Sequence, residues 1–460
     1  MSELPHISRT VSFSKIIVSI VLLISLVAVS GCVGGGGDSE NGATITIITR
    51  HDTSIQELFE EAFLDSAYAQ DANITKVRFM QPVSGLWPTA IENGGIDVAW
   101  GGGPTLFDQM VDLGYLYPMS PATMGDTLDS IPDTISGAPM KRYGADTTTP
   151  LWIAAAISSF GYTVNLDILE RYDLEKPLTW DDLANSEYYR DPPVVGIGNA
   201  PDTTSNTRIY EIILQNYGWD DGWIKLTEIA ANSGIYYGSV DVLNAVETGE
   251  IGIGTTIDFY GYSAMLDYPS TEYIIPTGQS LINADPIAIV YNTEQPDVAE
   301  AFVEFVLSAE GQAIWLDETI NRMPVLSEAF DTEFGLTRPD LKALFEETIS
   351  NQGIEFSDEL VNSYESTVVT YWEAVLDKPH EELRLAWHAL IEAMDDGKLT
   401  SAQWDEYVGR LGEPLITLEG AQAINEQILM DSSVANQKSV EWAQMKKDAY
   451  QDILDEIENL

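Results

Sequence analysis

The sequence predicts a mixed α/β fold of two lobes, followed by a C-terminal all-helical extension. Short apolar runs alternate with helical patterns from residue 43 to about residue 325, and strand-like runs then stop. A longer apolar run extends from Leu151 to Asn165. Such runs, ended by glycine and polar residues, are typical of strands buried on both faces, and Pro150 and Gly161 favour a strand over a buried helix. We expect this strand to cross between the lobes.

Ser158 and Ser159 interrupt the apolar run, and we expect them where the two lobes face each other. The alternative is an ordinary core strand whose two hydroxyls bond to the backbone.

The composition limits the partners of the chain. It has 460 residues, of which 45% are hydrophobic, enough for two or three domains. Lys and Arg number 22 against 73 Asp and Glu, a net charge of −51. This charge argues against binding to nucleic acid or to an anionic lipid surface. Because the acids are spread along the chain, they indicate a solvated surface suited to high salt.

The N-terminus has the pattern of an export signal over residues 1–31. Arg9 and Lys15 come before an apolar run, residues 16–29, and small residues lead to Cys32. The V-S-G-C ending resembles the lipobox of secreted lipoproteins, in which the cysteine is lipidated. Since a spanning helix needs ~20 apolar residues, an uncleaved anchor helix is the alternative. Residues 32–42, rich in glycine, are predicted to be a flexible tether on the outer face of the membrane.

Two strand ends in the first lobe carry candidate ligand-binding residues. Residues 44–49 form a predicted strand that ends at Arg50 and His51, before a helix that starts near Ile55. Free N–H groups at such a helix start favour an anion. Residues 96–100 form another strand, which ends in Trp100, Gly101, Gly102 and Gly103. Glycines there allow a ligand to approach the backbone, but neither nucleotide-binding glycine motif occurs.

The second lobe carries a hydroxyl-rich loop. Thr179 and Asp182 have the spacing of a capping box, and residues 193–197 form a predicted strand. The loop that follows leads into a helix predicted over 208–217, and it suits a small polar or anionic ligand. A plain capping loop is the alternative. Its candidate residues are Asp202, Thr203, Thr204 and Ser205.

A later strand, residues 250–257, ends in Asp258 and Tyr260, where acid and phenol would suit a metal ion or an amine. Two more strands, 273–276 and 286–291, flank a polar link that contains Asp285. Helices are predicted from Pro296 and, capped by Ser308, over 309–316.

The chain from Pro324 onward is predicted to be helical. Helices are expected over 339–350, 358–376 and 379–394, with others from Thr400, Leu418 and Ser439. We assign this extension no function beyond covering the lobes or contacting a partner.

Several segments, taken in order, resemble the extracellular solute-binding proteins of ABC importers. The similar branch includes ferric-iron, thiamine, polyamine and sugar-phosphate binders, and the resemblance covers Ala43 to Val325. The segments are Asp97-Val-Ala-Trp-Gly-Gly-Gly-Pro104, Gly161-Tyr-Thr-Val-Asn165, Leu178-Thr-Trp-Asp-Asp-Leu183, Glu247-Thr-Gly-Glu-Ile-Gly-Ile-Gly254, Ala301-Phe-Val-Glu-Phe-Val-Leu-Ser-Ala-Glu-Gly-Gln-Ala-Ile-Trp315 and Asn321-Arg-Met-Pro324.

The resemblance implies a type 2 periplasmic-binding-protein fold, with two lobes, two crossover strands and a ligand in the cleft between them. The implied lobe 1 is 43–150 with 280–325, lobe 2 is 151–279, and the extension is 326–460. The family's ligand loops fall on Thr49 to His51 and on Asp202 to Thr207. Ferric-binding relatives use two adjacent tyrosines, which here match Phe259 and Tyr260, so one phenol is missing.

The sequence therefore predicts a solute-binding lipoprotein that delivers a small charged or polar solute to an ABC permease and its ATPase. No cofactor and no enzymatic activity are expected. Arg50, His51 and two helix starts favour an anion, whereas Asp258, Tyr260 and Asp285 favour a cation or a metal, and the choice stays open. The predicted ligand-binding residues are Arg50, His51, Trp100, Gly101, Gly102, Gly103, Ser158, Ser159, Asp202, Thr203, Thr204, Ser205, Asp258, Tyr260 and Asp285.

Two other functions are compatible with the residues. One is a surface receptor or adhesin that uses the helical extension as its contact. The other is a secreted carboxylate-based hydrolase. The hydrolase is disfavoured because the chain has no H-E-x-x-H or G-x-S-x-G motif and only four histidines.

Overall fold

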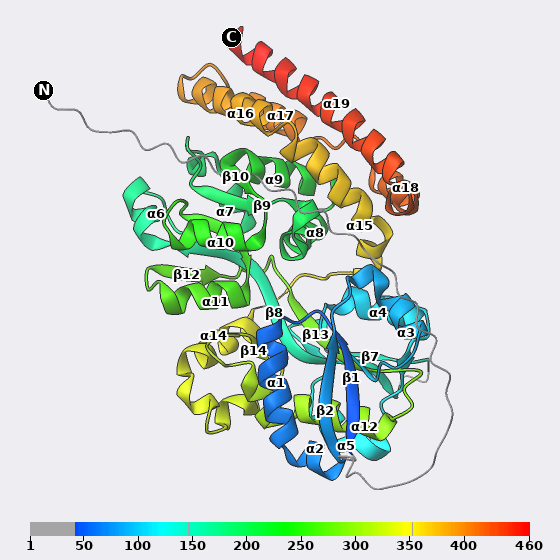
Figure 1. Cartoon of the computed structure of the whole chain (residues 1–460). Coiled ribbons are helices and arrows are strands. Elements are labelled where there is room, and N and C mark those ends of the chain that lie inside the picture. The colour runs from blue at the N-terminus through cyan, green and yellow to red at the C-terminus, as the bar shows by residue number, and fades with distance from the viewer. Residues whose placement is uncertain (1–41, 146–147, 352) are drawn as a thin grey trace, which may run out of the picture. The chain divides into compact units, whose positions relative to one another are not determined.

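The computed structural model describes residues 42–145, 148–351 and 353–460 (Figure 1). The predicted export signal, Cys32 and nearly all of the predicted tether lie outside these residues. Within the described ranges no helix is both long enough and apolar enough to cross a membrane.

One 12-stranded sheet forms the centre of the described chain, with the main order β10-β9-β11-β8-β13-β3-β1-β2. At one end β1 is parallel to β2 and β3, and at the other β9 is parallel to β10 and β11. The strands of this order are β1 (Ala43–Thr49), β2 (Ile74–Met80), β3 (Val98–Trp100), β8 (Pro150–Asn165), β9 (Val195–Gly198), β10 (Ser233–Tyr236), β11 (Ile253–Ile257) and β13 (Ile282–Val290). Four short strands pair with β8 or β13 off this order, namely β4 (Leu116–Tyr117), β7 (Lys141–Tyr143), β12 (Thr271–Ile274) and β14 (Met323–Pro324).

The long strand β8 joins the two ends of the sheet, as its apolar run predicts. Its first part pairs with β13, and its last residues pair with β11 and β12. Nearly every residue of β8 is buried, which explains the continuous apolar pattern.

The polar link predicted around Asp285 is wrong. Asp285 lies inside β13, which runs unbroken from Ile282 to Val290, and the register with β8 shifts between Asp285 and Pro286. The proline lacks an N–H for the ladder, so the strand accommodates it with a bulge instead of ending.

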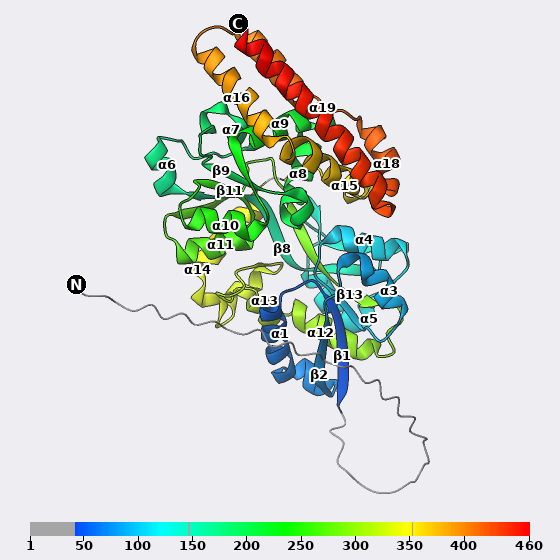
Figure 2. The same cartoon turned by 45° about the horizontal axis from the view of Figure 1, so that its top comes forward.

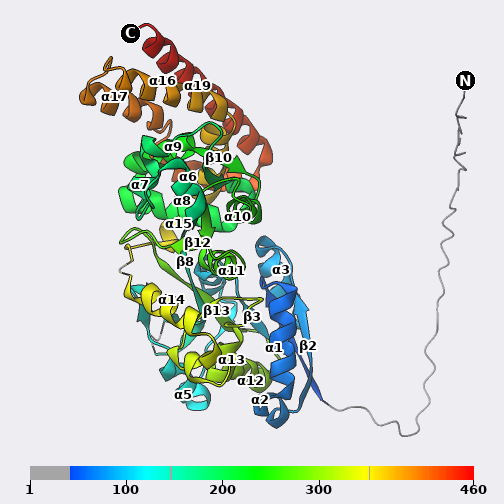
Figure 3. The same cartoon turned by 90° about the vertical axis from the view of Figure 1, so that its left-hand side faces the viewer.

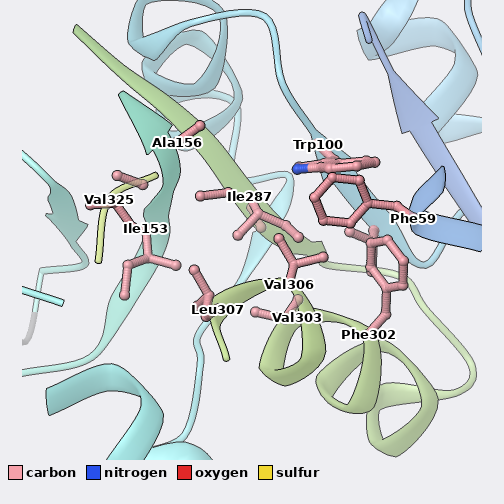
Figure 4. Close-up of a cluster of buried hydrophobic side chains, with 14 of the residues drawn as sticks. Phe59, Trp100, Ile153, Ala156, Ile287, Phe302, Val303, Val306, Leu307 and Val325 are labelled. Atoms are coloured by element: carbon pink, nitrogen blue, oxygen red, sulfur yellow. The ribbon is translucent and has the colours of Figure 1, made fainter. Parts of the chain in front are cut away.

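Two hydrophobic clusters pack against the sheet, and β8 contributes to both, up to Ile157 in the first and from Phe160 in the second. Trp100 lies in the first cluster, beside Phe59 and Phe302 (Figure 4). The first cluster takes side chains from α1 (Thr53–Asp65), α2 (Ala67–Asp71), α3 (Trp87–Glu92), α4 (Pro104–Asp112), α5 (Pro121–Ser130), α12 (Pro296–Leu307) and α13 (Ala309–Ile314). The second takes them from α6 (Leu166–Tyr172), α7 (Trp180–Ala184), α8 (Thr204–Tyr217) and α9 (Trp219–Asn232). Two further helices, α10 (Ser239–Glu247) and α11 (Asp258–Asp267), follow β10 and β11. The predicted lobe boundaries stay a prediction.

The C-terminal part is helical, as predicted, but it is divided between the clusters (Figure 3). Leu341 and Phe345 of α14 (Pro339–Ser350) pack in the first cluster. The later helices pack in the second, where α19 runs along α15 and α16 (Figure 2). These are α15 (Asp358–Trp372), continued by a π-helical turn, Glu373–Asp377, then α16 (His380–Asp395), α17 (Ser401–Gly412), α18 (Leu418–Met430) and α19 (Ser432–Glu458).

Several helix starts are the predicted ones. Thr179 and Thr400 each form a capping box, and Ser308 caps α13 through the N–H of Gly311. Terminal helix α19 begins earlier than predicted, at Ser432, because Asp431 caps it.

Candidate functional site

A cavity of about 400 Å³ lies where α8, α10 and α11 begin. It combines the predicted loop after β9 with the segment after β11, and it adds one arginine that follows α13. The residues that line it are Asp202, Thr203, Thr204, Ser205, Gly238, Ser239, Val240, Ile257, Phe259, Tyr260 and Arg322.

The loop after β9 contributes the N-terminus of α8. This helix begins at Thr204, four residues before the predicted start, so the hydroxyl-rich loop itself forms the first turn. Its N-cap residue Thr203 makes no side-chain cap bond, and its buried hydroxyl has no hydrogen-bond partner within the described ranges. The residue as a whole is 6% exposed and lines the cavity, so its unpaired hydroxyl is a polar group that a solute there could satisfy.

Two more helix starts face the same cavity. Gly238 precedes α10 and offers no side-chain cap, while Ser239 bonds to Ser205 across the loops at 2.7 Å. Because the first N–H groups of a helix lack intrahelical partners, the starts of α8 and α10 favour a negative group. At α11 one of these donors is already used, since the N–H of Phe259 donates to the side chain of Asp258 at 2.8 Å.

Arg322 supplies a positive charge at the cavity, and sequence reasoning did not include it among the site residues. Its guanidinium lies 4.6 Å from the centre of the Phe259 ring, and Nη1 donates to the carboxylate of Asp285. Arg322 belongs to the Asn321–Pro324 motif. A single basic residue between two helical regions is the only feature there that could have pointed to a binding role.

Asp285 holds Arg322 in place. Its Oδ2 accepts from Arg322, and its Oδ1 accepts from the N–H of Gly102 at 2.9 Å. Burial alone would raise the pKa of Asp285, but the charge of Arg322, aided by that N–H, lowers it below its ordinary value. The carboxylate is therefore ionised and already bonded.

His51 is buried beside this pair and neutral. Burial, with a smaller effect of Arg322, lowers its pKa to about 3 although Asp285 raises it. The ring lies 4.3 Å from that of Trp100, between centres, and Nε2 has no hydrogen-bond partner in the described part of the chain. His51 thus supplies no charge to the cavity.

The predicted glycines have a local explanation. Gly101, Gly102 and Gly103 all have positive φ, of 76°, 113° and 83°. A Cβ at Gly101 would lie 2.5 Å from Nε2 of His51, so this glycine makes room for the buried ring. The exposed Arg50 donates to the carbonyl of Pro82, and Trp100 is fully buried. None of these residues lines the 400 Å³ cavity.

Asp258, Ser158 and Ser159 are also buried and do not line the cavity. The carboxylate of Asp258 accepts from the N–H of Ser159 at 2.7 Å, and burial raises its pKa to about 7. It is fully buried, so a solute in the cavity does not reach it.

The described residues contain no group of three or more His, Cys, Asp or Glu side chains placed to hold a metal ion. Tyr260 lies beside Phe259, with ring centres 4.5 Å apart, so the adjacent residue carries no phenol.

A larger cavity, of about 760 Å³, lies elsewhere, between α4, β7 and the start of α15. Its charged residues are Asp108, Asp112, Lys141, Arg142 and Asp358, which carry both signs. It contains no predicted site residue.

Comparison with known proteins identifies the family. A phosphoglycerate transport regulatory protein from Salmonella typhimurium is 26% identical over 242 residues, which are 52% of this chain and 57% of that protein. The fold is similar to that of the periplasmic binding protein AfuA from Actinobacillus pleuropneumoniae, with fructose-6-phosphate bound (TM-score 0.55, 20% identity, 73% of this chain and 98% of that one). It is also similar to that of the spermidine/putrescine ABC transporter substrate-binding protein PotD from Streptococcus pneumoniae (TM-score 0.52, 17% identity, 70% of this chain and 96% of that one). Residues 47–313, more than half of the chain, match the bacterial extracellular solute-binding proteins, and the chain belongs to this family.

Proposed function

We propose that this protein captures a small anionic solute, carrying a phosphate or a carboxylate, in the cavity at the start of α8, α10 and α11, and delivers it to an ABC permease. The observation that carries the proposal is the position of Arg322. Its guanidinium lines a cavity into which helix starts also open.

The chemistry of these groups is complementary to an oxyanion. A guanidinium forms charge-assisted, planar pairs with phosphate and carboxylate groups. Uncapped helix starts add N–H donors and the positive end of the helix dipole. The free hydroxyl of Thr203 adds a further donor, and Asp202 and Tyr260 would suit hydroxyl groups elsewhere on the solute.

Two of the three residues that favoured a cation, Asp258 and Asp285, are engaged inside the protein, whereas Tyr260 lines the cavity. Asp285 is bonded to Arg322 and Gly102, and Asp258 is fully buried and bonded to two backbone N–H groups. Neither carboxylate lines the cavity, so the case for an amine or metal ligand is weaker than the case for an anion.

Two similar proteins add support for a phosphate-bearing solute. One is described as a phosphoglycerate transport regulatory protein, and the structure of another contains fructose-6-phosphate. The aligned region of the first spans only 57% of its length, so its substrate and partners enter here as support alone.

We propose that export and anchoring precede capture. The apolar run before Cys32 would direct export, and lipid on Cys32 would hold the protein at the outer face of the cell membrane beside its permease. A Cys32→Ser variant should then appear in the medium, and mass spectrometry should find lipid on wild-type Cys32. An unmodified Cys32 in membrane-bound protein would instead indicate an anchor helix.

The solute class is tested by thermal shift and calorimetry on the purified chain. We expect 3-phosphoglycerate or fructose 6-phosphate to raise the melting temperature, and spermidine or divalent cations to leave it unchanged. Arg322→Gln should weaken binding of the phosphate compound by about tenfold to a hundredfold, because it removes a charge-assisted contact.

The matched control is Arg142→Gln, which removes a half-exposed arginine at the other cavity. It should leave the affinity unchanged. Stabilisation by polyamines or metal ions alone would contradict the anion proposal. Delivery is tested by ATPase stimulation of the reconstituted permease with the loaded protein.

A further inference from the structure

A partly buried polar cluster outside the solute cavity joins three helices. Nη2 of Arg208 donates to Oγ1 of Thr105 at 2.7 Å and to Oδ1 of Asp358 at 2.9 Å. The hydroxyl of Thr105 in turn donates to the same Asp358 oxygen at 2.6 Å. These residues, here named the latch, form a closed triangle of hydrogen bonds.

The latch connects the N-terminal parts of helices from the two hydrophobic clusters. Thr105 is the second residue of α4, whose Leu106 and Phe107 belong to the first cluster. Arg208 follows Thr204 by one turn in α8, whose buried residues belong to the second cluster. The start of α8 lines the solute cavity, so the latch acts on a helix that forms the site.

Asp358 reaches the latch from the C-terminal helices. It is the first residue of α15, and Figure 1 shows this end of α15 beside α4. Gln215 of α8 makes two hydrogen bonds to the backbone of Ser357, the residue before Asp358. Its Nε2 donates to the Ser357 carbonyl at 3.1 Å, and its Oε1 accepts from the Ser357 N–H at 2.8 Å. The start of α15 is therefore attached to α8.

The later helices are also attached to the second cluster. Trp387 of α16 donates to Asn232 at 2.9 Å, and Arg384 donates to the carbonyl of Ala231 at 2.9 Å. The start of α15 and α8 would therefore move as one body. Thr105, on α4, is then the residue of the latch that belongs to the first hydrophobic cluster.

Arg208 would stay with α8 and the start of α15 if the two hydrophobic clusters moved apart. Nη1 lies 3.4 Å from Glu211 of the same helix, and the guanidinium covers the ring of Phe356 at 4.9 Å. Side-chain exposures of 11% for Arg208 and 18% for Asp358 show that water has little access to the pair. Opening would thus break the two bonds to Thr105 and leave the Arg208–Asp358 pair intact.

We infer that Asp358 is a positioning residue. With Arg208 it forms a binding site for the Thr105 hydroxyl that is already in place before closure. The bonds to Thr105 then stabilise the closed arrangement of the two lobes. The C-terminal helices, which lie outside the family match at 47–313, would in this way set how readily the protein releases its solute. The effect on release rests on the proposed function, whereas the effect on closure does not.

The test uses the full chain with Cys32→Ser and spin labels at Glu57→Cys on α1 and Asp221→Cys on α9, two exposed positions. Double electron–electron resonance, recorded without any solute, reports the distance between the two spin labels. The parent protein should populate the distance of this structure, and Thr105→Val should raise the ratio of open to closed protein about tenfold. Thr105→Ser, which keeps the hydroxyl, should restore the parent ratio.

Thr123→Val is the matched control, since the hydroxyl of Thr123 bonds to Glu300 within the first cluster's helices. It should leave the distances unchanged. If Thr105→Val fails to fold, Asp358→Asn replaces it and should also increase the open population. Unchanged distances in the folded variants, or a parent protein that never populates the closed distance, would overturn the inference.

Inorganic phosphate and 3-phosphoglycerate then serve as probes of release. Their dissociation should be several-fold faster in Thr105→Val than in the parent. If neither compound binds while the distances still shift, the proposed solute class is wrong and the latch stands. If both bind with equal rates and distances do not shift, the latch is wrong and the solute class stands.

Discussion

Arg322 shows how one side chain gains its role from buried neighbours. Asp285 and the Phe259 ring hold its guanidinium. The side chains of Arg322 and Asp285 are only 14% and 10% exposed, so the ion pair is largely shielded from water. A buried ion pair is costly to break, because the remaining charge has no partner and little solvent.

Asp285→Asn should therefore lower the free energy of unfolding by about 3–5 kcal/mol. Asp331→Asn is the control, because its ion pair with Lys342 is exposed and should contribute less than about 1 kcal/mol. Urea denaturation measures both. A loss for Asp285→Asn as small as that of the control would show that Asp285 does not neutralise Arg322.

Asp258 predicts a pH dependence of stability. Burial raises its folded-state pKa from 3.8 to about 7, although the N–H groups of Ser159 and Phe259 oppose the rise. A raised pKa means that the folded state prefers the protonated acid, so its contribution to stability is complete below pH 3.8 and is lost as pH rises through 7.

The free energy of unfolding should thus decrease between these two pH values by up to about 4 kcal/mol through this group. Asp258→Asn should remove that part of the slope, as measured by urea unfolding from pH 4 to pH 8. An identical slope in the variant would place the titration on another residue.

At the scale of elements, the turn between β3 and α4 depends on glycine for two reasons. Gly101 has a φ of 76°, and a Cβ there would also meet the buried His51 ring at 2.5 Å. Gly114, after α4, has a similar φ of 72° but nothing within 4 Å of the added atom. The two positions separate backbone strain from steric overlap.

Gly114→Ala should cost about 1–2 kcal/mol, the usual penalty of a left-handed residue with a side chain. Gly101→Ala should cost more, about 3 kcal/mol or above, because the His51 ring cannot move without disturbing Trp100. Thermal unfolding of both variants compares them. Equal losses would mean that the His51 pocket adapts.

At the scale of the whole molecule, the charge of −51 opposes compaction of the chain. Salt screens this self-repulsion, with a Debye length of about 3 Å at 1 M. The acids are spread over the sequence, so the effect concerns the entire described fold and not one patch.

The melting temperature should therefore rise as NaCl increases from 10 mM to 1 M. Sucrose at matched osmolality is the control, because it stabilises by exclusion from the surface and does not screen charge. A flat or falling melting temperature in NaCl would show that repulsion between the acidic side chains does not limit the stability of this protein.

Much of the fold could be predicted from local patterns. The β8 run, the capping boxes at Thr179 and Thr400, and α14 at Pro339–Ser350 all follow from apolar periodicity and cap chemistry, which act over a few residues. Asp285 was misplaced because a proline inside a strand has the same local signal as a strand end.

The site was only partly predictable. The sequence alone identified the family, from short segments that recur in a fixed order along the chain. It also predicted a site at the hydroxyl loop of Asp202 to Ser205 and at Tyr260, residues that line the smaller cavity. Only the tertiary structure decided that Asp285 is bound by Arg322, 37 residues away, and that Asp358 meets Thr105 and Arg208 across 253 and 150 residues. Contacts over such separations arise from how the sheet and helices pack, and no periodicity or short motif encodes them.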